Sequence, residues 1–179
     1  IKSFSKAINI DENNSKAYNN RGLCYLLIGK NSLGLIDFNK AIKLDSKNPF
    51  FISNRATCYD NLKKFNNAYN DYSNAINLNK NIGLFYYNRA ITQNSMNTPN
   101  YQEAIEDLTK SISLKTNYSD FNLTVRNDDN TLYFYQYNLA DAYYNRGFIY
   151  SVLNSNTKAI NDYKKSIELK PSATAYYNL

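Results

Sequence analysis

The fold of this 179-residue chain is decided by a short motif that first occurs as Ala17-Tyr18-Asn19-Asn20-Arg21-Gly22. Closely similar stretches follow, and the arginine of the motif returns at Arg55, Arg89 and Arg146. The first two spacings between these arginines are 34 residues, and the third is 57, which equals 34 plus an insertion of 23. Repetition at such a period predicts stacked copies of one small structural unit.

A second series of similar residues accompanies the first. It begins as Phe38-Asn39-Lys40-Ala41-Ile42, and its small residue returns at Ala75, Ser111 and Ser166. Apolar residues within both series recur at helical spacing, so we expect each unit to contain two helices, called here helix A and helix B. A helical hairpin of this size cannot bury both of its faces alone, and the copies must therefore stack into a solenoid.

Local signals support these helix pairs. Asn48 can cap a helix that Pro49 opens, and Asn100 with Glu103 resembles a capping box. We expect small residues to let the two helices approach closely; on helix A they are Gly22, Ala56, Ala90 and Gly147, and on helix B Ala41, Ala75, Ser111 and Ser166.

The repeated arginine is interpreted as structural, with its aliphatic stem over apolar surface and its guanidinium charge near Asp37 or Asp71. The acids of helix B, which include Asp107 and Asp162, indicate helix pairing or a solvated face.

This pattern resembles the tetratricopeptide repeat family, in which aromatic and small residues recur over 34 positions. The resemblance implies an all-α fold, a right-handed α-solenoid of antiparallel helix pairs. We expect full repeats at 15–48, 49–82, 83–118 and 140–173, of which the third has a two-residue expansion. An insertion with a helix extension is expected at 119–139. Residues 1–14 are expected to form the second helix of an earlier repeat, and residues 174–179 the start of a later repeat. The chain is then expected to be a piece of a longer array. Gly34 and Gln93 depart from the family pattern.

The insertion is the place where the chain departs from a plain solenoid. Residues 117–129 have the composition of a loop, and a long helix is expected from about 130 to 153. The aromatic residues at its start are Tyr133, Phe134, Tyr135 and Tyr137. They either pack on the loop or form a second binding surface, through which the chain could self-associate. A further alternative is that this segment folds back into the groove where a ligand would bind and occludes it.

Composition excludes several classes of protein. The chain has no His and two Cys, which removes the usual zinc sites and His-based catalysis. It is 43% hydrophobic with a net charge of +6, and no segment is long and apolar enough to span a bilayer. We therefore expect no enzyme, no metal, no cofactor and no membrane contact. Cys24 and Cys58 suit free buried thiols in the cytoplasm.

The resemblance also implies where a ligand lies, because helices A of the family line a concave groove. The residues expected to contact a peptide are Asn20, Leu23, Phe50, Asn54, Leu84, Tyr87, Asn88, Ile91, Tyr144, Asn145 and Phe148. The asparagines among them resemble the ladder with which long members of the family grip a peptide backbone. Asn is abundant in this chain, at 31 residues, so its recurrence is weak evidence by itself.

A second family mode is disfavoured by the sequence. Members that grip the terminal carboxylates of chaperones use a Lys and an Asn from the first A helix, an Asn from the second, and a Lys and an Arg from the third. The corresponding positions here hold Asn19, Leu23, Asn54, Leu84 and Asn88, so only the middle Asn is kept. The sequence thus predicts a non-catalytic scaffold that binds a peptide or helix of a partner protein without such a clamp. The alternatives are an RNA-binding helical repeat, which the acidic residues Asp60 and Asp141 in the groove disfavour, and an architectural or self-associating spacer.

Overall fold

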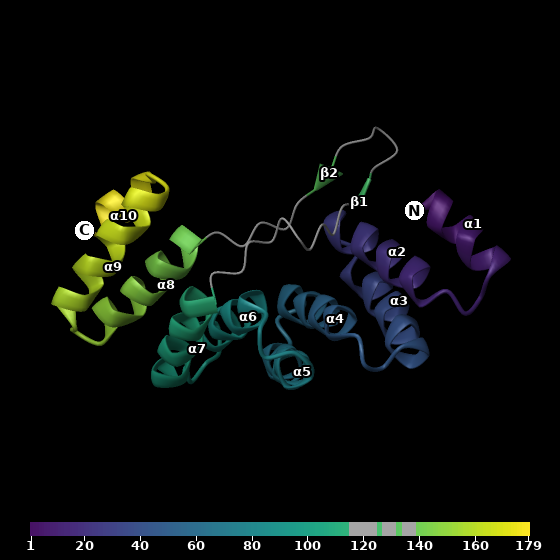
Figure 1. Cartoon of the computed structure of the whole chain (residues 1–179), viewed down its shortest axis with the longest axis horizontal. Helices are drawn as coiled ribbons and strands as arrows, with labels where there is room; N and C mark the ends of the chain where they lie inside the picture. The colour runs from purple at the N-terminus through teal and green to yellow at the C-terminus, as the bar shows by residue number, and fades with distance from the viewer. Residues whose placement is uncertain (115–124, 127–131, 134–138) are drawn as a thin grey trace. The chain divides into compact units, whose positions relative to one another are not determined.

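The computed structural model describes residues 1–114, 125–126, 132–133 and 139–179. Apart from one pair of short strands, these residues form helices and the short turns between them (Figure 1). They divide into two compact units, each of which is described by itself. The first unit contains helices α1 to α5 and both strands, and the second contains helices α6 to α10.

The first unit is built of antiparallel helix pairs. Its helices are α1 (Lys2–Ile10), α2 (Ser15–Leu27), α3 (Asn31–Leu44), α4 (Pro49–Asn61) and α5 (Phe65–Leu78). The closest packing joins α2 to α3 and α4 to α5, and α3 also packs on α4. Helices A and B of the expected repeats are therefore α2 with α3 and α4 with α5.

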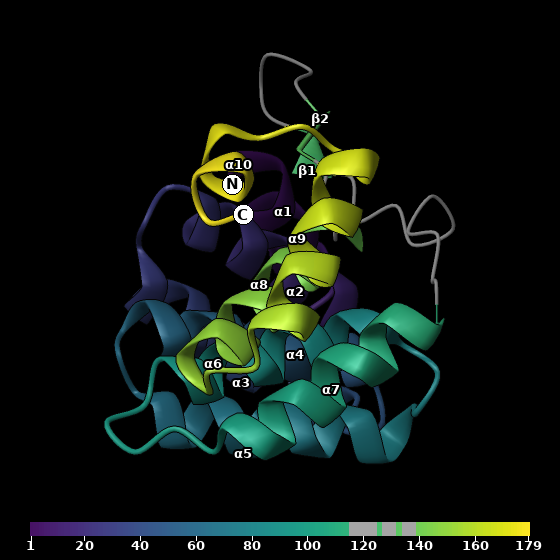
Figure 2. The same ribbon diagram turned by 90° about the vertical axis from the view of Figure 1, so that its left-hand side faces the viewer.

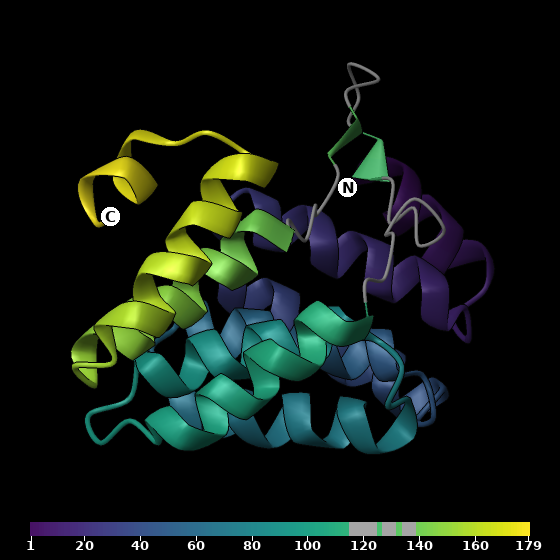
Figure 3. The same cartoon turned by 60° about the vertical axis from the view of Figure 1, so that its left-hand side comes forward.

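The second unit repeats this arrangement. Its helices are α6 (Gly83–Asn94), α7 (Tyr101–Leu114), α8 (Leu139–Val152), α9 (Asn156–Leu169) and α10 (Ala173–Tyr177). Helix α6 pairs with α7 and α8 with α9, and α7 packs on α8. The pairing of α8 with α9 can be followed from two further directions in Figures 2 and 3. The all-α solenoid fold is confirmed, whereas the exact repeat boundaries stay a prediction.

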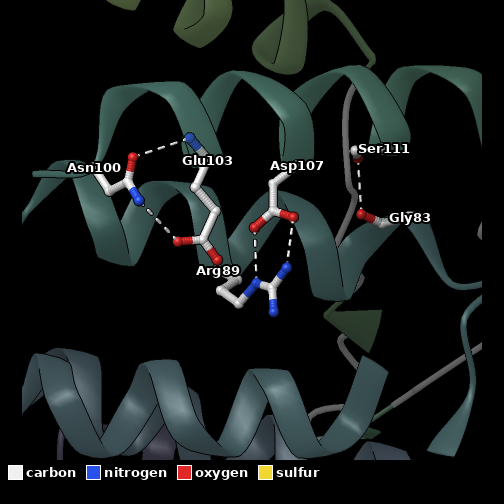
Figure 4. A network of polar contacts seen from close by, with 6 residues as sticks. All are labelled: Gly83, Arg89, Asn100, Glu103, Asp107 and Ser111. Carbon is white, nitrogen blue, oxygen red and sulfur yellow. Dashed lines mark hydrogen bonds and ion pairs between the residues drawn. The ribbon is translucent and has the colours of Figure 1, made fainter. Parts of the chain in front are cut away.

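The helix ends form as the sequence predicts. The side chain of Asn48 accepts a hydrogen bond from the Phe50 backbone N–H at 3.1 Å, and Pro49 opens α4. Before α7, the Asn100 side chain accepts from the Glu103 backbone N–H at 3.2 Å and donates to the Glu103 carboxylate at 3.3 Å (Figure 4). The bonds from the Phe50 and Glu103 backbone N–H groups satisfy donors that a helix start leaves without partners.

Each helix pair has a small residue of helix A against a large residue of helix B. A methyl group added at Gly22 would lie 2.9 Å from the ring of Phe38, and one added at Gly147 would lie 3.1 Å from the ring of Tyr163. The large residues are all fully buried; they are Phe38, Tyr72, Leu108 and Tyr163. The unusual Gly34 has a similar reason, since a methyl group there would lie 3.0 Å from the Cys58 sulfur.

A buried ion pair also joins the two helices of every pair. Arg55 donates from Nε and Nη2 to the two carboxylate oxygens of Asp71, at 2.7 and 2.8 Å. The same bidentate contact joins Arg21 to Asp37, Arg89 to Asp107 (Figure 4) and Arg146 to Asp162. All four carboxylates are buried. The structural interpretation of the arginine is confirmed, and the idea that these acids lie on a solvated face is wrong.

The arginines also reach the preceding helix B through a third nitrogen. Nη1 of Arg55 donates to Asn39 at 2.8 Å, and Nη1 of Arg146 donates to Thr109 at 2.9 Å. Nη1 of Arg21 donates in the same way to Ser5 of α1 at 3.2 Å. One side chain thus connects three consecutive helices.

The insertion departs from the sequence prediction. Strand β1 (Val125–Arg126) pairs antiparallel with β2 (Leu132–Tyr133), and the structure describes α8 from Leu139 onward. The helix expected from about 130 is therefore wrong at its start. Its first residues are rich in Tyr, Phe and Thr, which favour strands, so the apparent helical rhythm there was misleading. Most of the expected loop 117–129, and three of the four aromatic residues, lie outside the described residues.

Gln93 generates a prediction on stability. Its side chain is 2% exposed, and neither its amide nitrogen nor its amide oxygen has a hydrogen-bond partner among the described residues. Burying an amide without partners costs about 1–3 kcal/mol, so Gln93→Met should raise the free energy of unfolding by about 1 kcal/mol or more. Urea denaturation followed by circular dichroism measures this change. Gln102→Met, at an exposed position of α7, is the control and should change little; a lower midpoint for Gln93→Met would contradict the prediction.

Candidate functional site

The residues expected to bind a peptide fall into two sets, one in each unit. The first contact set lies on α2 and α4 and contains Asn20, Leu23, Phe50 and Asn54. The second contact set lies on α6 and α8 and contains Leu84, Tyr87, Asn88, Ile91, Tyr144, Asn145 and Phe148. All of these residues therefore lie on A helices, as the repeat pattern predicts.

In the first contact set, side-chain amides bond to one another across two helices. Asn54 of α4 donates from Nδ2 to the side-chain oxygen of Asn19 at 2.9 Å. Asn19 in turn donates from Nδ2 to the side-chain oxygen of Asn20 at 3.1 Å. Asn19 is buried, whereas Asn20 and Asn54 are half-buried. The amides of Asn20 and Asn54 therefore have structural partners, and only their remaining donors and acceptors are available to a ligand.

In the second contact set, a phenol takes the place of one amide. Asn145 of α8 donates from Nδ2 to the hydroxyl of Tyr87 on α6 at 3.3 Å and to the backbone oxygen of Asp141 at 2.7 Å. Burial raises the pKa of Tyr87 to about 12, and the negative charge of Asp141 acts in the same direction. Tyr87 is therefore a neutral phenol at physiological pH.

The same contact occurs once more at the last helix. Asn178, directly after α10, donates from Nδ2 to the hydroxyl of Tyr144 at 2.9 Å, and the ring of Tyr144 packs on Tyr163 with centroids 5.7 Å apart. Asn54 and Asn145 occupy the sixth position of their repeats, and Asn178 follows two tyrosines as Asn145 does. Each of the three donates to the fifth-position side chain of the preceding A helix. Sequence reasoning missed this role. The sequence held a signal for it, because a side chain that can accept a hydrogen bond, Asn or Tyr, directly precedes each of the asparagines at 20, 88 and 145.

The predicted contact residues differ in how accessible they are. Leu23 is 4% exposed and packs with Cys24, Leu26, Phe38 and Cys58, so it belongs to the core of the first unit. Phe148 is 39% exposed and is the most open apolar member of either set. The remaining members, polar and apolar, are half-buried. Accessible apolar surface is thus concentrated in the second contact set.

Other chemistry has little support in the described parts of the chain. No three His, Cys, Asp or Glu side chains there come together in a way that would hold a metal ion. Cys24 and Cys58 are buried free thiols, and burial raises the pKa of Cys58 to about 12, which makes that thiol a poor nucleophile. None of the described helices has the length and apolar character needed to cross a membrane.

Comparison with known proteins identifies the family. Tetratricopeptide repeats match residues 3–33, 52–82 and 140–172. The chain belongs to the tetratricopeptide repeat family. Helical repeats of this family serve as scaffolds for protein interaction. No curated protein matches the sequence.

Solved structures share this fold. MamA is 21% identical, with a TM-score of 0.75 over 94% of this chain and 85% of that one. The pilF protein of Pseudomonas aeruginosa is 18% identical, with a TM-score of 0.74 over 94% of this chain and 66% of that one. The first TPR of Spaghetti (RPAP3), bound to the HSP90 peptide SRMEEVD, is 27% identical, with a TM-score of 0.54 over 57% of this chain and 80% of that one.

Proposed function

We propose that this protein is a non-catalytic scaffold whose A helices bind a segment of a partner protein. The observation that carries the proposal is the second contact set, where the exposed Phe148 lies on α8 with the half-buried Tyr144 and Asn145, and Asn145 bonds the half-buried Tyr87 of α6. An apolar surface beside donors and acceptors fits a peptide, which needs both burial of its side chains and partners for its backbone. The peptide-bound relative supports this use of the fold.

The chemistry of that relative does not carry over directly. Its peptide, SRMEEVD, is acidic, and the positions at which the family holds carboxylates contain Asn19, Leu23, Asn54, Leu84 and Asn88 in this chain. None of these side chains carries a positive charge, and Asn19 and Leu23 are buried. We therefore propose binding of an internal segment of a partner, not of a chaperone C-terminus. The buried thiols Cys24 and Cys58 support a reducing compartment such as the cytoplasm.

Phe148 provides the most direct test of this surface. Peptides are first selected against the whole chain from a phage-displayed random library, and the affinity of one selected peptide is then measured by fluorescence anisotropy. Burial of an aromatic side chain contributes about 1.5–3 kcal/mol, so Phe148→Ala should weaken binding by about tenfold or more. The control is Leu169→Ala, which removes a similarly exposed apolar side chain, 45% exposed against 39%, from helix B α9. Equal affinities for both variants would contradict the proposal.

Asn88 tests whether an amide contacts the peptide backbone. Its side chain forms no hydrogen bond with any residue that the structure describes, so Asn88→Ala should leave the unfolding midpoint nearly unchanged. Loss of one hydrogen bond of about 0.5–1.5 kcal/mol should weaken the same peptide by about two- to tenfold. Asn54→Ala is a useful comparison, because it also removes the bond to Asn19 and should lower stability as well. Unchanged affinity for Asn88→Ala would exclude this amide as a peptide contact.

A further inference from the structure

The second contact set lies beside a single carboxylate. Asp141 is exposed in the first turn of α8, three residues before Tyr144, four before Asn145 and seven before Phe148. Residues at these spacings lie on one side of a helix. Asn145 bonds both the Asp141 backbone and the Tyr87 hydroxyl, which places Asp141 where α8 meets α6.

The charge of Asp141 is not neutralised by the described parts of the protein. Helices α6 and α8 carry two further charged residues, Arg89 and Arg146, and both are held by the buried carboxylates of helix B. No Lys or Arg in residues 1–114 and 139–179 forms an ion pair with Asp141. Although the whole chain has a net charge of +6, this surface is therefore locally negative. A carboxylate near a helix start interacts favourably with the helix dipole, but that interaction leaves the side chain open to a cation.

The neighbouring side chains also favour a cation. The rings of Tyr87, Tyr144 and Phe148 belong to the same contact set, and aromatic faces attract ammonium and guanidinium groups. Tyr87 stays neutral because burial raises its pKa to about 12, so it adds no negative charge, and its hydroxyl accepts a hydrogen bond from Asn145. A ligand carboxylate at this point would meet the repulsion of Asp141 and no described cation to offset it.

We propose that the second contact set selects partner segments that carry a Lys or Arg side chain, whose cation pairs with the Asp141 carboxylate beside these rings. This inference rests on the proposed function, since it names the chemistry of the peptide that the same surface binds. This surface would therefore prefer a positively charged peptide, whereas a carboxylate-binding surface of the family prefers an acidic peptide terminus.

The test uses four pools of fluorescein-labelled peptides with Lys, Arg, Glu or norleucine fixed at the centre, flanked by mixtures of Leu, Tyr, Ser and Asn. Fluorescence anisotropy measures their affinity for the unaltered chain, for Asp141→Asn and for Glu106→Gln. Glu106→Gln removes the same charge from an exposed position of helix B α7, so it controls for the general field of the unit. An exposed ion pair should make the Lys and Arg pools about two- to fivefold tighter than the norleucine pool.

The outcomes separate the inference from the proposed function. We expect Asp141→Asn to abolish the preference for Lys and Arg without changing the norleucine affinity, and Glu106→Gln to keep the preference. Equal binding of the Lys and norleucine pools, or a preference that survives in Asp141→Asn, would overturn the inference alone, provided that Phe148→Ala still weakens the norleucine pool. Failure of every pool to bind, or binding that Phe148→Ala does not change, would overturn the proposed function and the inference with it.

Discussion

The buried contact between an arginine of helix A and an aspartate of helix B is the interaction on which the rest of this structure depends. A carboxylate removed from water is costly unless a cation and hydrogen bonds compensate it, and each arginine supplies both through two parallel N–H donors. Because the pair recurs in four helix pairs, it fixes each helix A on its helix B at the same position. The third nitrogen of Arg21, Arg55 and Arg146 also bonds a side chain of the preceding helix. The same arginine therefore holds helices A and B of one repeat together and connects that repeat to the one before it.

The contact residues inherit their positions from this arrangement. With helices A and B fixed, neighbouring A helices approach closely enough for Asn54 to reach Asn19 and for Asn145 to reach Tyr87. These contacts use part of the hydrogen-bonding capacity of the asparagines, which makes the sixth position a connection between repeats before it is a contact for a ligand. In the proposed function, the apolar and acidic side chains around Asn145 give the affinity and preference for a ligand. A regular scaffold with differing residues at a few exposed positions is how a helical repeat acquires a partner of its own.

Much of the fold follows from the sequence, because repeat spacing, small residues and capping signals are local or periodic. The partners of the asparagines do not, since a bond between Asn145 and Tyr87 depends on the distance between two A helices 58 residues apart in the chain. Burial of Leu23 was missed for a related reason, because its neighbours Phe38 and Cys58 come from two other helices. The predicted start of the helix at about residue 130 was wrong because the aromatic residues there fit both a strand and a helix. Sequence therefore predicts the elements well and the contacts between them less well.

A double-mutant cycle on Arg55 and Asp71 tests the central claim most directly. Arg55→Met, Asp71→Leu and the double variant are compared with the unaltered chain by urea denaturation. If the pair holds the helices together, each single change leaves a buried charge without its partner and should cost about 3 kcal/mol, and the double variant should cost clearly less than the sum. A coupling energy of about 2 kcal/mol or more is the predicted result. Costs that simply add, with a coupling energy below about 0.5 kcal/mol, would contradict the account.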